Sequence, residues 1–134
     1  MSATAVFRVK VAVVGAHLSG QPLNHQLTDR RATLVRTCRT SACYRLYALA
    51  GTVPAKPGMV RVASGGVGIE VEVWEMDVTS FGTFVAAVPG PLGIGTVELE
   101  DGEKVKGFIC EGYAVEGARD ISEFGGWRGY LNAK

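Results

Sequence analysis

The sequence has no apolar run that approaches the roughly 20 residues needed to cross a bilayer. Its N-terminal stretch also has no basic region ahead of an apolar core, because Arg8 and Lys10 interrupt the apolar residues. We therefore expect no signal peptide. These absences argue against a membrane protein and predict a cytoplasmic one.

Cysteine and histidine are scarce, with three cysteines (Cys38, Cys43 and Cys110) and two histidines in the chain. Without an export signal, the thiols are expected to be reduced. A zinc site built from them and one histidine is conceivable, but Cys38-x4-Cys43 followed by a distant Cys110 matches no common zinc module. Buried thiols are the better interpretation. We therefore predict no metal and no cofactor.

Acidic residues are nearly missing from the first half of the sequence, and basic residues are the minority in the second half. Residues 1–61 carry nine Lys/Arg and a single acid, Asp29, whereas residues 62–134 carry five Lys/Arg and twelve acids. Such a split can indicate an anionic ligand site or a nucleic-acid face. Because the basic residues alternate with apolar ones and no nucleic-acid motif is present, mutual neutralisation across one fold or across a homodimer is favoured.

What the sequence does contain is ordinary globular composition, with 134 residues and 47% hydrophobic content, which predicts one domain over residues 1–134. Eighteen scattered glycines suit a strand-rich fold with many tight turns. Hydrophobic periodicity predicts strands at 5–14, 32–40, 44–49, 60–63 and 68–76. A short helical turn after Pro22, a loop over 51–58, a helix over 78–88 capped by Asp77, and a short tail helix over 118–131 are also expected.

A hairpin is predicted over residues 93–111, and its register can be derived. A two-residue Asp101-Gly102 turn would set Val97 opposite Lys106 and mix the two faces. A three-residue turn, with Gly102 left-handed, pairs Val97 with Val105 and keeps each face uniform. Together these elements predict an α+β fold, with a strongly curved mixed sheet or small β-barrel and short flanking helices.

The stretch VVGAHLSGQPLN, residues 13–24, holds the most informative ionisable side chain. His17 lies between Gly15 and Gly20 after an apolar strand, where backbone N–H groups can form an anion nest. Gly15-x4-Gly20 imitates half of a phosphate-binding loop but lacks its Lys-Ser/Thr, so nucleotide binding is not expected. From these residues alone His17 is either a proton carrier or a residue that only fixes the loop.

Other polar residues have a structural interpretation beside each functional one. Arg36, Arg39 and Arg45 could bind a carboxylate, but such arginines usually form surface pairs with acids. The glutamates that flank Trp74 could include an inward-pointing general acid, although they are more typical of a solvated face. Neither a nucleophile elbow nor an amidase-type serine segment is present.

Nearly the whole chain, from Val11 to Leu131, resembles the C-terminal domain of allophanate hydrolase. The resemblance rests on GAHLSG (15–20), GTVPAKPG (51–58), EVEVWEM (70–76), PLGIGTV (91–97) and FGGWR (124–128). It implies a fold similar to that of gamma-glutamylcyclotransferases, whose glycine-rich loop binds substrate through its backbone. The acid that cyclotransferases use should fall near 86–91, where this chain has none, so that chemistry is not expected.

The resemblance implies a role in loss of carbon dioxide from N-carboxycarbamate, the small dianion left when an amidase removes ammonia from allophanate. His17 matches the family's loop histidine and is the expected proton-transfer group. The alternative is a catalytically silent module that binds a small anion or a separate amidase chain. The residues predicted to contact the anionic substrate are Gly15, Ala16, Leu18, Asn24, Arg39, Tyr44 and Arg45.

Overall fold

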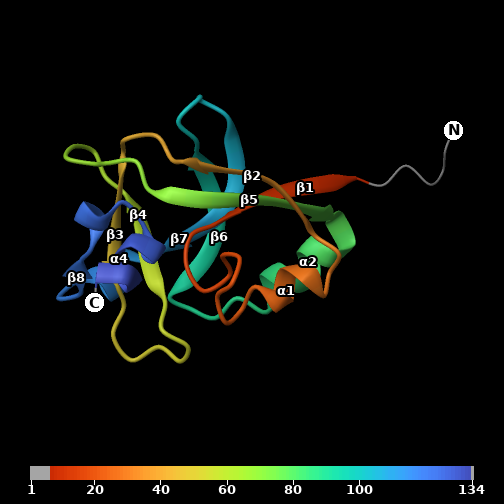
Figure 1. The fold of residues 1–134 in the computed structure, drawn as a ribbon, viewed down its shortest axis with the longest axis horizontal. Helices are drawn as coiled ribbons and strands as arrows, with labels where there is room; N and C mark the ends of the chain where they lie inside the picture. The colour runs from red at the N-terminus through yellow and green to blue at the C-terminus, as the bar shows by residue number, and fades with distance from the viewer. Residues whose placement is uncertain (1–6, 134) are drawn as a thin grey trace, which may run out of the picture.

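A computed structural model describes residues 7–133, which form two β-sheets with short helices (Figure 1). The larger sheet has five strands in the order β2-β5-β1-β7-β6. Its central strand β1 pairs antiparallel with β5 and parallel with β7, so the sheet is mixed, as predicted. The strands are β1 (Arg8–Val13), β2 (Thr33–Arg39), β5 (Glu70–Asp77), β6 (Leu92–Glu98) and β7 (Lys104–Cys110).

The smaller sheet has the order β4-β3-β8 and lies beside one end of the larger one (Figure 1). Its strands are β3 (Tyr44–Ala48), β4 (Pro57–Arg61) and β8 (Arg119–Asp120). Because β4 begins at Pro57, the predicted loop over 51–58 is two residues too long. Pro57 starts an edge strand, where a missing backbone N–H is tolerated.

Short helices connect the strands, and the best defined is α2 (Val78–Ala86). As predicted, Asp77 caps it, and its side chain accepts a hydrogen bond from the Ser80 backbone N–H. In Figure 1, α1 (His25–Thr28) lies beside α2. The other helices are α3 (Gly112–Val115), the 3-10 helix η1 (Ser122–Phe124) and α4 (Trp127–Ala133).

The β6–β7 hairpin has the predicted register. Val97 pairs with Val105, and the adjacent pair Glu98–Lys104 precedes the turn. Gly102 has a φ of 91°, the left-handed conformation that the three-residue turn requires. The alternation of side chains across this hairpin was therefore sufficient to fix its register.

The larger sheet is curved but does not close into a barrel. Its edge strands β2 and β6 meet only at one end, through a Thr40–Leu99 bridge and a hydrogen bond from the Ser41 N–H to the Glu98 carbonyl oxygen. No continuous ladder joins β2 to β6 within residues 7–133. The curved-sheet prediction is therefore confirmed, and the closed-barrel alternative is not.

Several other predicted elements have different bounds in the structure. The strand predicted over 60–63 is β4, Pro57–Arg61, and the helix predicted over 78–88 ends at Ala86. The first strand begins at Arg8, and the predicted residues 5 and 6 lie outside the described part of the chain. The single tail helix over 118–131 was wrong, because the chain forms β8, η1 and α4 in turn. Gly125 adopts a φ of 78° between η1 and α4, and this left-handed residue ends the first helix.

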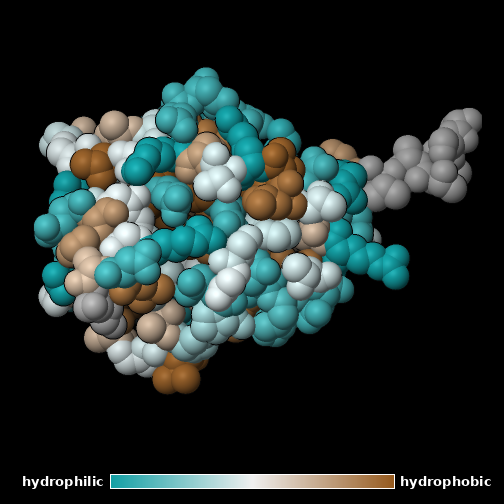
Figure 2. Space-filling model, in the orientation of Figure 1, coloured by the Kyte–Doolittle hydropathy of each residue, from teal (hydrophilic) through white to brown (hydrophobic). Residues whose placement is uncertain are grey.

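The opposite charges of the two halves pair within the fold, as predicted. Arg36 contacts Asp101 and Glu103, and Arg45 contacts Asp120. In the view of Figure 2, hydrophobic surface is divided into small patches between hydrophilic regions. Among residues 7–133, no helix has the length and apolar character needed to span a membrane.

Candidate active site

His17 is delivered by β1 into an aromatic pocket. Its ring stacks on Phe108 of β7 at a centroid distance of 4.9 Å and meets the edge of Phe84 of α2 at 5.2 Å. The residue is 9% exposed. A strand, a helix and a hairpin therefore fix the position of this ring. Such rigid support is what a side chain needs if it is to be aligned with a substrate.

Hydrogen bonds define both the orientation and the protonation of His17. Its Nε2 lies 2.7 Å from Oε1 of Gln26, and because an amide oxygen only accepts, Nε2 carries the proton. The Asn24 side-chain amide donates to the His17 carbonyl oxygen at 2.8 Å, which holds the backbone of the loop. Nδ1 of His17 has no partner among residues 7–133 and is left as a proton acceptor.

Burial lowers the pKa of His17 below its ordinary value, and the positive charges of Lys56 and Arg30 lower it further. The hydrogen bond to Gln26 opposes this shift and is the smaller effect. His17 is therefore neutral at pH 7, with a basic nitrogen inside a mostly apolar pocket.

Two adjoining hollows share His17, Lys56, Leu92 and Phe108 in their walls. The one that is also lined by Gln26 and Pro54, which we call the outer hollow, has a volume of about 180 Å³. The other, which we call the inner hollow, has a volume of only about 20 Å³. No carboxylate pairs with the Lys56 ammonium among the residues described. The hollow therefore combines an uncompensated positive charge with a neutral histidine.

The first half of the loop supplies backbone donors beside this hollow. Gly15, Ala16 and His17 line the inner hollow, and their amide N–H groups have no acceptor within the described chain. Gly15 is required here because a Cβ at this position would collide with the Pro57 ring. Backbone N–H groups of this kind favour an anionic ligand.

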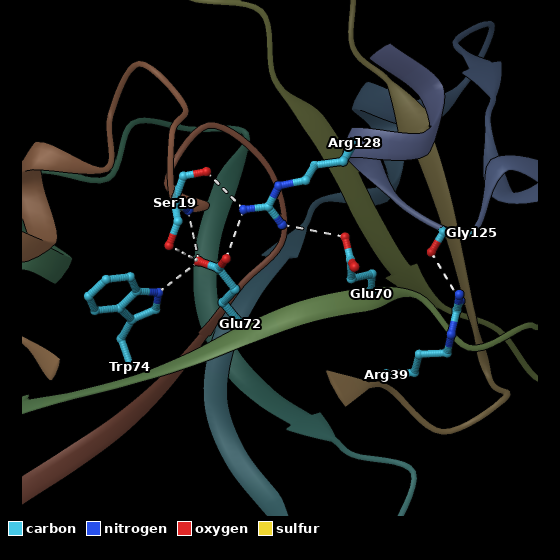
Figure 3. A network of polar contacts seen from close by, with 7 residues as sticks. All are labelled: Ser19, Arg39, Glu70, Glu72, Trp74, Gly125 and Arg128. Atoms are coloured by element: carbon cyan, nitrogen blue, oxygen red, sulfur yellow. Dashed lines mark hydrogen bonds and ion pairs between the residues drawn. The ribbon is translucent and has the colours of Figure 1, made fainter. Parts of the chain in front are cut away.

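The second half of the loop is tied to a buried carboxylate that sequence analysis assigned to a solvated face. Glu72 of β5 is 3% exposed, and its Oε1 accepts from the Ser19 N–H at 2.8 Å, from the Ser19 hydroxyl and from Trp74 Nε1 (Figure 3). Arg128 of α4 donates to Glu72 Oε2 and to the Ser19 carbonyl oxygen, each at 2.8 Å. We call Ser19, Glu72, Trp74 and Arg128 the loop clamp.

Burial by itself would raise the pKa of Glu72, but the hydrogen bonds from Arg128, Ser19 and Trp74 outweigh it and lower the pKa. Glu72 is therefore a carboxylate whose acceptor sites are filled by the protein. The I-E-V-E-V-W-E pattern gave no sign of this, because alternation alone cannot distinguish a solvated face from one covered by a distant helix.

The structure separates the predicted substrate-contacting residues into three groups. Gly15 and Ala16 line the hollow with His17, whereas Asn24 supports the loop from outside and the fully buried Leu18 anchors it in the core. The remaining three lie elsewhere and are engaged in structural contacts.

Arg39 donates to the carbonyl oxygens of Gly68 and Gly125, and Arg45 pairs with Asp120. The Tyr44 hydroxyl accepts from the Glu98 N–H inside the core. None of these three lines a hollow that contains His17, so their placement does not support the predicted substrate contacts. Lys56 does line both hollows, but sequence analysis assigned its segment only as a loop and did not single it out.

The cysteines are all free thiols, and burial raises the pKa of Cys38 and of Cys110. Within residues 7–133, no group of three His, Cys, Asp or Glu side chains is placed to hold a metal ion. Metal-free protein stays a prediction to be tested by metal analysis.

The fold and site define a class: an α+β domain in which the loop after the first strand brings a neutral histidine and free backbone amides to one hollow, and the segment before β4 adds a lysine. The family model of the allophanate hydrolase C-terminal domain matches residues 9–132, and the chain belongs to this family. The match confirms the resemblance noted in the sequence.

Relatives in yeasts are much longer proteins. Urea amidolyase of Saccharomyces cerevisiae is 51% identical over 127 residues, which are 92% of this chain and 7% of that protein. The Kluyveromyces lactis allophanate hydrolase structure superposes with a TM-score of 0.89 at 50% identity, covering 93% of this chain and 21% of the other. The chain thus spans only a small fraction of these relatives.

A structure of comparable length also matches. A protein specific to uropathogenic E. coli has a TM-score of 0.86 and 35% identity, and the match covers 95% of this chain and 98% of that one. The same fold is therefore present in a solved chain of about this size.

Proposed function

We propose that this protein promotes loss of carbon dioxide from N-carboxycarbamate, or from a related small carboxylated urea derivative, in urea and allophanate nitrogen metabolism. The observation that carries the proposal is the hollow where neutral His17, the unpaired Lys56 ammonium and the free amides of residues 15–17 meet. Membership of the allophanate hydrolase C-terminal family supports this choice of substrate.

The outer hollow, with a volume of about 180 Å³, has room for a compact dianion, whereas the amide-lined inner hollow of about 20 Å³ has room for only a part of it. Lys56 and the loop amides would bind one carboxylate, leaving the nitrogen between the two carboxylates close to His17. A dianion beside His17 raises the pKa of the imidazole, because the opposite charge favours its protonated form. Substrate binding would therefore load a proton on Nδ1, the nitrogen without a partner.

The proposed step is balanced as follows. The proton on His17 passes to the substrate nitrogen, the bond from that nitrogen to one carboxylate carbon breaks, and its electron pair stays on nitrogen. Carbon dioxide leaves and carbamate remains, while His17 returns to its neutral form. An amidase must supply the substrate by removing ammonia from allophanate, and a separate amidase chain is part of the proposal.

The test adds this protein to an amidase that converts allophanate to N-carboxycarbamate and follows carbon dioxide release above the spontaneous rate. His17→Ala should lower the rate constant by about 10²–10⁴-fold, the usual effect of losing a general acid or base. His17→Gln, which keeps more of the buried volume, should lower it similarly.

His25→Ala is the matched control, because the side chain of His25 is 60% exposed and, among residues 7–133, its ring pairs with Asp29 alone. Its rate should equal that of the wild type. If His17→Ala keeps the wild-type rate and only melts at lower temperature, the histidine is structural. The alternative, a silent module that binds a small anion or an amidase, then replaces the proposal.

A further inference from the structure

The loop clamp joins the last helix of the chain to the loop that carries His17. Gly125 and Gly126 bring the start of α4 against β5: the Glu70 N–H donates to the Gly125 carbonyl oxygen at 2.9 Å, and a Cβ on Gly126 would lie 3.0 Å from Glu70 Cβ. This close approach places Arg128 two residues later, where its guanidinium reaches both Glu72 and Ser19 (Figure 3).

The clamp fixes the loop at the end opposite to β1. Ser19 follows His17 by two residues, and Leu18 between them is completely buried. Both hydrogen-bonding groups of the Ser19 backbone are used, the N–H by Glu72 and the carbonyl oxygen by Arg128. His17 is thus held between a strand on one side and a partly buried ion pair on the other.

We infer that Glu72 and Arg128 are positioning residues, whose partly buried ion pair holds Ser19 and thereby sets the placement of the His17 ring for proton transfer. This inference rests on the proposed function of His17. It assigns the C-terminal helix to the working parts of the site, although α4 lines neither hollow that contains His17.

The clamp also divides the loop amides between two anions. Glu72 occupies the Ser19 N–H, so the internal carboxylate satisfies the far half of the loop. The amides of residues 15–17 stay available for a carboxylate of the substrate. Without Glu72, the Ser19 N–H would lose its acceptor and Arg128 would lose one of its two carboxylate partners, so both would be open to a competing anion.

The main test is Glu72→Gln, with Glu70→Gln as the matched control. Glu70 is on the same strand and contacts the same guanidinium at 3.5 Å, but its side chain is 35% exposed. Glu72→Gln should lower kcat for carbon dioxide release by about 10–100-fold with a smaller change in KM, since misplacement of a catalytic group by about 1 Å costs on this order. Glu70→Gln should stay within about twofold of the wild type.

Two further measurements report on position without depending on activity. In Glu72→Gln the Ser19 amide should exchange hydrogen faster, and the pKa of His17 followed by NMR should rise toward its ordinary value as the ring becomes better solvated.

In a His17→Ala background, Glu72→Gln should have no further effect on kcat, because residues that act through one group are not additive.

Should the single variant fail to fold, Glu72→Gln combined with Arg128→Gln removes both charges and leaves no unpaired ion in the interior. That double variant should show the same loss of kcat and the same faster Ser19 exchange. The inference is overturned if either folded variant keeps the wild-type kcat, His17 titration and Ser19 exchange, even with a lower melting temperature. A wild-type rate in His17→Ala would instead overturn the proposed function. The Ser19 exchange and His17 titration of the Glu72 variants would still test whether the loop clamp positions His17.

Discussion

At the scale of the residue, His17 shows how burial can prepare a group for an anion. The aromatic rings of Phe84 and Phe108 exclude water from the imidazole, which makes the charged form costly and keeps the ring neutral. A neutral ring beside Lys56 offers no attraction to cations and does not compete with the lysine for an anion. Under the proposed function, an arriving carboxylate would supply the negative charge that favours the imidazolium, so His17 would be protonated only when substrate is bound.

The lowered pKa of His17 has a consequence for stability. The unfolded chain takes up a proton near the ordinary value of about 6.5, whereas the folded protein does so only at lower pH. Stability from keeping His17 neutral is therefore fully present above pH 6.5 and declines as the pH falls toward the folded pKa. Urea unfolding between pH 8 and 5 should show the wild type losing stability faster than His17→Gln. Parallel curves would contradict this prediction.

At the scale of the element, the β6–β7 hairpin and the α2 helix depend on glycine in opposite ways. Gly102 has a φ of 91° in the hairpin turn, a conformation that a residue with a Cβ adopts only with strain. Gly82 lies within α2, where an added Cβ would meet no atom within 4 Å. The backbone conformation at position 102 requires glycine, whereas position 82 has space for a larger side chain.

These two positions should therefore respond oppositely to alanine. Gly102→Ala should lower the free energy of unfolding by about 1 kcal/mol or more, because the native φ disfavours alanine. Gly82→Ala should raise it by about 0.5–1 kcal/mol, because alanine is the better helix former. Urea denaturation with unchanged m-values measures both. A loss of stability in Gly82→Ala would contradict the open surroundings of Gly82 in α2.

The elements that sequence analysis predicted well are those with a local cause. Val97 and Val105 alternate with charged neighbours on both sides of Gly102, so one register alone keeps the faces uniform, and Asp77 stands directly before the α2 periodicity. The tail was wrong because Phe124, Trp127 and Leu131 have helical spacing across Gly125, which ends η1. Spacing by itself could not show that the backbone reverses there.

The site was predicted only in part, because some of its residues have no local signal in the sequence. His17 and Gly15 are marked by their own neighbours, but Glu72 and Arg128 are separated by 56 residues and meet only when α4 packs on β5. Nothing near Glu72 distinguishes it from Glu70 or Glu75 in the sequence. Lys56 likewise gains its significance from a fold that brings the 51–57 segment against the first loop.

At the scale of the whole molecule, glycines at two positions allow the two sheets to approach each other closely, and we call this contact the seam. A Cβ on Gly15 would collide with Pro57, and a Cβ on Gly58 would lie 2.7 Å from the Cys110 sulfur. Gly15 belongs to the loop after β1, whereas Pro57 and Gly58 belong to β4 of the smaller sheet. The inner hollow lies along this seam, so its width depends on the distance between the sheets.

Adding one methyl group to the seam should separate the sheets. Gly15→Ala should lower the free energy of unfolding by about 1–3 kcal/mol, the usual cost of overpacking, and should also weaken binding of a small dicarboxylate. Gly93→Ala is the control, because a Cβ there meets nothing within 4 Å and the change should cost no more than about 0.5 kcal/mol. Equal stability and binding in the two variants would show that the seam accommodates a side chain.

The contact between Arg128 and Ser19 joins positions 109 residues apart, so the two residues are synthesised at different times. A ribosome that adds about 5–20 residues per second needs roughly 5–20 s to travel from one to the other. Throughout that interval the loop around His17 has been made but lacks the guanidinium that holds it. The loop that carries His17 is thus held in place only after α4 has been synthesised, and under the proposed function this domain would become competent only when α4 forms.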